Sequence, residues 1–169
     1  MRTFLSKILP STCVCFMAAG TALADMSVEL QAPWGGRNIP NGQHCALQGG
    51  HGETPPMQVS GVPDGAVWLI AEFNDKSYRP LSRNGGHGVI GFPVQGAVTT
   101  LPAVPANSTN LPGGAQVVSA GRGTGDYASV GYLPPCSGGA GNRYSVDIKA
   151  VSSDGQVLES VTNVIIGRY

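Results

Sequence analysis

Apolar and polar residues alternate along several short runs of this 169-residue chain. The clearest alternation covers residues 144–151, where every second side chain is apolar. A period of two residues is typical of a strand that buries one face, so we predict a strand here. The residues on its apolar face are Tyr144, Val146, Ile148 and Ala150.

Further runs predict more strands, and helix signals are nearly absent. The Asp154-Gly155 pair predicts a tight turn after the strand at 144–151. Gly and Pro, 25 and 13 residues, interrupt almost every run, which favours short strands and loops. Residues 95–125 are rich in turn-forming residues and are interpreted as a long surface excursion. We therefore predict an all-β to mostly β sandwich of short strands, long loops and little helix. The additional predicted strands are 27–31, 67–73, 88–92, 156–158 and 161–166.

The first 24 residues have the pattern of a cleaved signal peptide. Arg2 and Lys7 precede an apolar stretch, and the small residues before Asp25 suit a signal peptidase that cuts after Ala24. We expect residues 25–169 to form a single domain in the periplasm or outside the cell. No later apolar run approaches a membrane-spanning length, so no integral membrane segment is expected after cleavage.

The charge, the cysteine content and the missing motifs of this sequence each reduce the number of functions that it can have. With Arg2 and Lys7 removed, eight basic residues stand against ten acidic ones without a basic stripe, so nucleic acid is not an expected partner. Cys45 and Cys136 form an even pair in an oxidising compartment, either as a disulfide or as two buried thiols. Zinc-ligand spacings and hydrolase or nucleotide-binding motifs are missing from the sequence, and Gly121–Gly125 is interpreted as a loop. We predict a protein that is not an enzyme and has no catalytic residue, metal or cofactor.

Three segments carry a resemblance to a known family. They are residues 39–63 (IPNGQHCALQGGHGETPPMQVSGVP), 87–93 (HGVIGFP) and 131–144 (GYLPPCSGGAGNRY). In order and spacing they resemble the phosphatidylethanolamine-binding protein family, in its bacterial Raf-kinase-inhibitor-like branch. The resemblance implies a β-sandwich of that family's type over almost all of residues 25–169.

The chain departs from the family pattern at several positions. Phe73 stands where the family has the first of two acidic residues, and Asn74 replaces a proline. Gly88 follows the histidine in place of tryptophan, and Asn142 replaces a second histidine. These changes imply a cleft that is weakened or altered in its ligand preference.

The resemblance also implies a set of ligand-binding residues. The family's pocket binds small anions such as phosphate or acetate, and phosphorylated head groups. His87 would be the main side-chain donor, and Asp75 would accept a proton from His87 or from a ligand ammonium. Tyr132 would supply a hydroxyl, Pro135 a rigid wall, and Asn142 a further donor. A structural role for His87, bonded to a backbone carbonyl, stays open.

Two functions follow. The first is a non-catalytic periplasmic or secreted protein that binds a small anion or phosphorylated head group around His87. The second is a protein-interaction module, similar to a protease or kinase inhibitor, in which residues 95–125 contact a protein partner and the cleft is degenerate. A plain adhesion or envelope domain is a third possibility. Either a monomer or a homodimer is compatible with the sequence.

Overall fold

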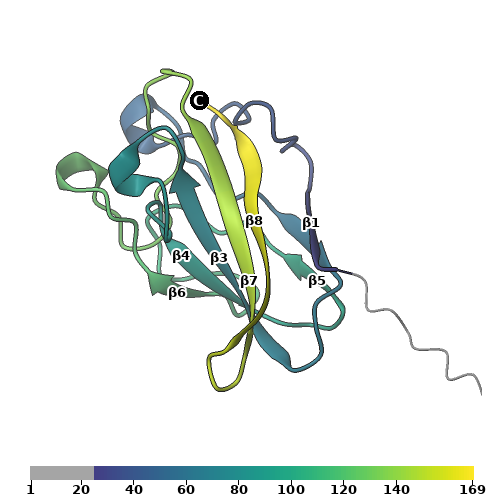
Figure 1. Cartoon of the computed structure of the whole chain (residues 1–169). Helices are drawn as coiled ribbons and strands as arrows, with labels where there is room; N and C mark the ends of the chain where they lie inside the picture. Colours follow the sequence, from purple (N-terminus) through teal and green to yellow (C-terminus); the bar gives the residue numbers. More distant parts are fainter. Residues whose placement is uncertain (1–24) are drawn as a thin grey trace, which may run out of the picture.

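The structure is a computed structural model that describes residues 25–169, and the predicted signal peptide lies outside them. Two antiparallel sheets form a sandwich with only short 3₁₀ helices between strands (Figure 1). The predicted mostly-β fold is therefore confirmed. The smaller sheet has the order β1-β2-β5, with β1 Ser27–Leu30, β2 Met57–Ser60 and β5 Val98–Leu101. The larger has the order β6-β4-β3-β7-β8, with β6 Gln116–Ser119, β4 Val89–Pro93, β3 Ala66–Asp75, β7 Arg143–Ser152 and β8 Val157–Arg168. The 3₁₀ helices are η1 Ala46–Gln48, η2 Arg79–Leu81 and η3 Gly125–Tyr127.

The predicted strand at 144–151 is β7, and its apolar face is buried as expected. The four side chains of that face are at most 2% exposed. β7 pairs with β3 on one side and with β8 on the other, so it lies inside the larger sheet. Facing side chains from the smaller sheet complete the core. Those from β2 and β5 are Met57, Val59 and Leu101, each fully buried.

β3 confirms the central strand that was predicted at 67–73, and it continues for two further residues. Asn74 and Asp75 are polar and yet almost completely buried at its end. Such residues persist in a core only where hydrogen bonds satisfy them. This end of β3, at the top of Figure 1, lies next to the start of β7 and supports the cleft described below.

The two predicted strands at 156–158 and 161–166 are one strand, β8. The ladder with β7 shifts register where residues 162 and 163 lie opposite Asp147. Asn163 has a φ of 61°, and its N–H donates to Asp147 Oδ1 at 2.6 Å. The interruption in the pattern is therefore a β-bulge inside one strand, not a break between two.

The interpretation of residues 95–125 as a surface excursion is wrong for part of that segment. It contains both β5 and β6, and Thr99, Leu101 and Val104 are fully buried. Val98 to Leu101 alternates between exposed and buried positions, which is the pattern of a strand with one buried face. The residue types do not show this alternation, because the apolar Val98 is exposed and the polar Thr99 is buried.

No helix within residues 25–169 is both long enough and apolar enough to span a membrane.

Candidate ligand-binding cleft

A cleft of about 500 Å³ opens at the end of the larger sheet where β3 ends and β7 begins. Its walls come from parts of the chain that are far apart in sequence: the end of β3, residue 87, residues 122–127 and residues 133–144. Of the five predicted ligand-binding residues, the structure brings Asp75, His87 and Asn142 together around this cleft. Tyr132 and Pro135 do not line it.

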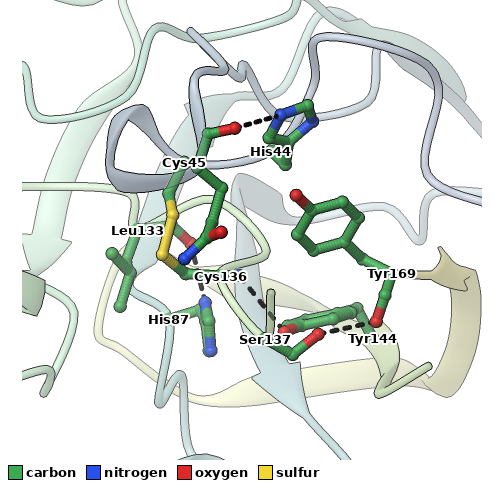
Figure 2. Close-up of a disulfide and its surroundings, with 9 residues drawn as sticks. His44, Cys45, His87, Leu133, Cys136, Ser137, Tyr144 and Tyr169 are labelled. Carbon is green, nitrogen blue, oxygen red and sulfur yellow. Dashed lines mark hydrogen bonds between the residues drawn. A yellow bond between two sulfur atoms is a disulfide. The ribbon is translucent and has the colours of Figure 1, made fainter. Parts of the chain in front are cut away.

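His87 is held on three sides by backbone groups. Its N–H donates to the Phe73 carbonyl at 2.9 Å, and its own carbonyl accepts from the Leu133 N–H at 2.8 Å. Its ring Nδ1 lies 2.8 Å from the Leu133 carbonyl (Figure 2). A carbonyl can only accept, so Nδ1 carries the hydrogen. The backbone contact that was considered for a structural histidine is therefore present, and it leaves Nε2 for another partner.

His87 Nε2 has no hydrogen-bond partner among the described residues, although the side chain is only 3% exposed. Burial lowers the pKa of His87 below its ordinary value, against the opposing effects of the Leu133 carbonyl and the Asp75 carboxylate. The ring is therefore neutral at neutral pH, and Nε2 presents a lone pair. The sequence predicted His87 as a donor to a ligand, whereas its donor Nδ1 is used by the Leu133 carbonyl.

The Asp75 carboxylate is occupied by the protein itself. Its Oδ1 accepts from the backbone N–H groups of Ser77 and Tyr78, at 2.8 and 3.1 Å. Its Oδ2 accepts from Asn142 Nδ2 at 2.7 Å. Asp75 therefore fixes the turn after β3 and ties it to the loop before β7. Within residues 25–169 no hydrogen bond joins Asp75 to His87, so the first of its two predicted partners is absent. A ligand ammonium as the second partner stays a prediction.

Tyr144, at the start of β7, is a cleft residue that sequence reasoning did not assign to the site. Its ring meets the His87 ring edge-on, with the centroids 5.3 Å apart and the planes at 83°. Its Oη accepts from the Cys136 N–H at 3.2 Å, so the O–H remains a donor (Figure 2). Burial, with a smaller contribution from the Asp75 carboxylate, raises the pKa of Tyr144 to about 12. Its match to the family motif was the signal that could have revealed it.

Tyr132 and Pro135 lie behind the cleft. Tyr132 is 1% exposed and packs edge-on against Phe73, with ring centroids 4.8 Å apart. Its hydroxyl is buried and has no hydrogen-bond partner among the described residues, and burial raises the pKa of Tyr132. Pro135 is also buried, and its carbonyl accepts from the Cys45 N–H at 3.0 Å. Phe73 is therefore a core residue and does not line the cleft.

Asn74 supports the loop that leads into His87. Its Oδ1 accepts from the N–H groups of Gly85 and Gly86, at 3.0 and 3.3 Å. Its Nδ2 donates to the Glu72 carbonyl at 3.0 Å and to Asp147 Oδ2 at 3.2 Å. A side-chain amide can both donate and accept, and here it does both in a buried position. The residue that replaces the family's proline thus fixes the approach to the site.

The loop at 121–125 forms one wall of the cleft through Arg122 and its neighbours. The Arg122 guanidinium donates to the carbonyls of Asn84, Arg83 and Pro80, at 2.7, 2.8 and 3.2 Å. It therefore holds the loop before His87 from the outside while Asn74 holds it from the inside. Sequence patterns do not predict this contact, because Arg122 and its partners are 38 to 42 residues apart.

The predicted disulfide between Cys45 and Cys136 is confirmed, with the two Cα atoms 5.2 Å apart and a sequence separation of 91. It joins the start of η1 to the cleft segment that holds Tyr144 (Figure 2). Behind it lies a second hollow of about 350 Å³, to which exposed His51 belongs. His44 instead stacks on Tyr169, with centroids 4.7 Å apart. Neither histidine lines the cleft.

The arrangement defines a class of protein: a small β-sandwich with a polar cleft at one end of the larger sheet. No protein-family model matches the sequence. A curated relative, the UPF0098 protein of Chlamydia trachomatis, is 29% identical over 153 residues, which cover 83% of this chain and 92% of the relative.

A solved structure extends the comparison. A protein described as a homologue of phosphatidylethanolamine-binding proteins, also from Chlamydia trachomatis, superimposes with a TM-score of 0.54 and 24% identity. The match covers 86% of this chain and 97% of the other. The predicted resemblance to the phosphatidylethanolamine-binding protein family is confirmed, and the chain has that fold. The assignment to the Raf-kinase-inhibitor-like branch stays a prediction.

Proposed function

We propose that this protein binds a small anion or phosphorylated head group in the cleft around His87 and does not catalyse a reaction. The observation that carries the proposal is the buried His87 Nε2, which has no hydrogen-bond partner within residues 25–169 and belongs to a ring in edge-on contact with Tyr144. A buried polar atom without a partner costs on the order of 1–3 kcal/mol, and a ligand that satisfies it regains that free energy. Ligand binding is therefore more favourable in this cleft than on other surfaces of the molecule.

The proposal includes export to the periplasm or the outside of the cell. The Cys45–Cys136 disulfide supports it, because structural disulfides persist in oxidising compartments. The expected result is a mature chain that begins at Asp25 in the exported fraction, measured by intact-mass spectrometry. A full-length chain in the cytoplasmic fraction would contradict this part of the proposal.

The binding proposal is tested by NMR titration of the purified, oxidised protein with inorganic phosphate and with phosphoethanolamine. The side-chain resonances of all three histidines are followed. A saturable shift at His87, without one at His44 or His51, is the expected result. If His87 does not respond to millimolar ligand, the cleft does not bind these anions, and the protein-interaction alternative gains support.

A further inference from the structure

The chain contains two Asn-Gly pairs, at residues 41–42 and 84–85. In such a pair the backbone nitrogen of the glycine can attack the side-chain amide carbon of the asparagine, since glycine has no side chain to obstruct the approach. The attack requires that the peptide nitrogen lose its hydrogen and that the peptide unit turn toward the side chain. Hydrogen bonds to that peptide unit must therefore open before a folded protein can react.

The Asn41–Gly42 peptide unit is free at both ends. Neither the Asn41 carbonyl nor the Gly42 N–H makes a hydrogen bond within residues 25–169. The pair forms the centre of a surface turn, which the Gln43 N–H closes by donating to the Pro40 carbonyl at 3.0 Å. Asn41 is exposed and Gly42 is partly exposed, so water reaches both reacting groups.

The Asn84–Gly85 peptide unit is held at both ends. Its carbonyl accepts from the Arg122 guanidinium at 2.7 Å, and its N–H donates to Asn74 Oδ1 at 3.0 Å. The Asn84 side chain is exposed, but Gly85 is buried. The Val89 side chain packs directly against Gly85, which leaves the peptide unit little room to turn. The two pairs therefore have the same local sequence and opposite surroundings.

We propose that Asn41 is a site of spontaneous modification, at which the folded protein converts to aspartate and isoaspartate. The hydrogen bonds with Asn74 and Arg122 protect Asn84 from the same reaction. In the reaction, the Gly42 nitrogen forms a bond to Asn41 Cγ and the bond from Cγ to the side-chain nitrogen breaks. That nitrogen leaves as ammonia with the hydrogen from the peptide nitrogen. Water then opens the cyclic imide at either carbonyl, so the net reaction consumes water and releases ammonia.

The modification changes the loop that carries Cys45. Both products add a negative charge to the turn, and isoaspartate also lengthens its backbone. The His51 N–H donates to the Gly42 carbonyl at 3.0 Å. The Glu53 N–H donates to Gln43 Oε1 at 2.7 Å. Both hydrogen bonds depend on the shape of the turn, so the amides of His51 and Glu53 should exchange with solvent faster in the modified protein.

The decisive experiment follows both pairs in one sample. The purified, oxidised protein is incubated at pH 8.5 and 37 °C and then digested at acidic pH, where the cyclisation is slow. Chromatography with mass spectrometry separates the asparagine, aspartate and isoaspartate peptides. We expect conversion at Asn41 to be at least ten-fold faster than at Asn84. In concentrated urea the two rates should agree within about two-fold, because no hydrogen bond then holds either pair.

Two variants test the protection of the second pair. Asn74→Ala removes the acceptor of the Gly85 N–H, and conversion at Asn84 should rise at least ten-fold. Arg122→Gln removes the donor to the Asn84 carbonyl and should raise the rate by a smaller factor. Arg122 is exposed, so this variant decides the question even if Asn74→Ala does not fold. The rate at Asn41 is the internal control and should stay at its wild-type value.

Equal rates at Asn41 and Asn84 in the folded protein, or a faster rate at Asn84, would overturn the proposal. So would an Asn41 that converts in urea and stays unmodified in the folded protein. An unchanged rate at Asn84 in the folded variants would overturn the protective role of Asn74 and Arg122. None of these outcomes depends on whether the cleft around His87 binds an anion.

Discussion

The two hollows on either side of the Cys45–Cys136 bridge differ in what their polar groups already do. Leu133 and Cys136 line both of them. On one side, His87 is buried with a ring nitrogen that no group within residues 25–169 satisfies. On the other, His51 is exposed and therefore hydrated. The comparison shows that a hollow of ordinary size becomes a candidate site when it contains a desolvated polar atom, because only that atom gains a partner on binding.

The largest expected effect comes from removing the bridge that separates the two hollows. The double variant Cys45→Ser/Cys136→Ser frees a loop of 91 positions in the unfolded chain. Its free energy of unfolding should fall by about 4 kcal/mol in the chain-entropy model. Urea denaturation measures the change, and the wild-type protein under reducing conditions is the control. An unchanged midpoint would show that the bridge does not stabilise the fold.

A smaller effect is expected from Asn74, which holds the loop that leads into His87 at the cleft. Asn74→Ala removes four hydrogen bonds at once, two buried and two partly buried, and leaves the buried N–H groups of Gly85 and Gly86 without their acceptor. We expect a loss of about 2–3 kcal/mol in urea denaturation. Exposed Asn110→Ala should stay within about 0.5 kcal/mol of the wild type. If both variants behave alike, Asn74 does not organise the approach to His87.

The pH dependence of stability separates the two histidines further. Because the pKa of His87 is lowered in the folded state, the unfolded chain takes up the proton first as the pH falls. The free energy of unfolding therefore does not depend on His87 above about pH 6.5. Below that pH, His87 lowers it by at most about 1.4 kcal/mol per pH unit. Urea curves at pH 7.5 and 5.0 should show a shallower loss for His87→Asn than for the wild type. His51→Asn should keep the wild-type loss, and a shallower one there would contradict the assignment.

The smallest effect concerns the tyrosine that sequence comparison placed in the site. Tyr132→Phe removes a buried hydroxyl that has no partner, so stability should rise by up to about 1 kcal/mol and ligand affinity should not change. Tyr144→Phe removes a donor at the cleft and should weaken phosphate binding about ten-fold. Calorimetric titration of both variants provides the test. If Tyr132→Phe binds phosphate more weakly than the wild type, Tyr132 is a binding residue and its placement outside the cleft is wrong.

Sequence patterns predicted the fold best where a strand lies inside the larger sheet. β7 alternates from Arg143 to Ala150, and β3 is apolar along most of its length, so the residues of each strand predict it without reference to its partners. β5 and β6 have only four residues each and depend on β2 and β4, their distant partners. Their pairing is set by the whole fold, and a local pattern cannot show it.

The sequence predicted which residues lie at the candidate site better than it predicted what each of them does there. His87, Asp75 and Asn142 do lie around one cleft. The role of His87 depends on a carbonyl 46 positions away, which determines the ring nitrogen that carries the hydrogen. The role of Asp75 depends on the turn after β3, because two backbone N–H groups of that turn donate to its Oδ1. Long-range hydrogen bonds of this kind leave no periodic trace in a sequence.

The triple attachment of His87 has a consequence for amide hydrogen exchange. The N–H groups of His87 and Leu133 are both donors in the contacts that hold this residue. Neither amide can exchange with solvent unless the segment at 85–88 separates from β3 or from residue 133. Their exchange rates therefore measure how often the imidazole loses its fixed orientation, and a bound ligand should slow both amides together.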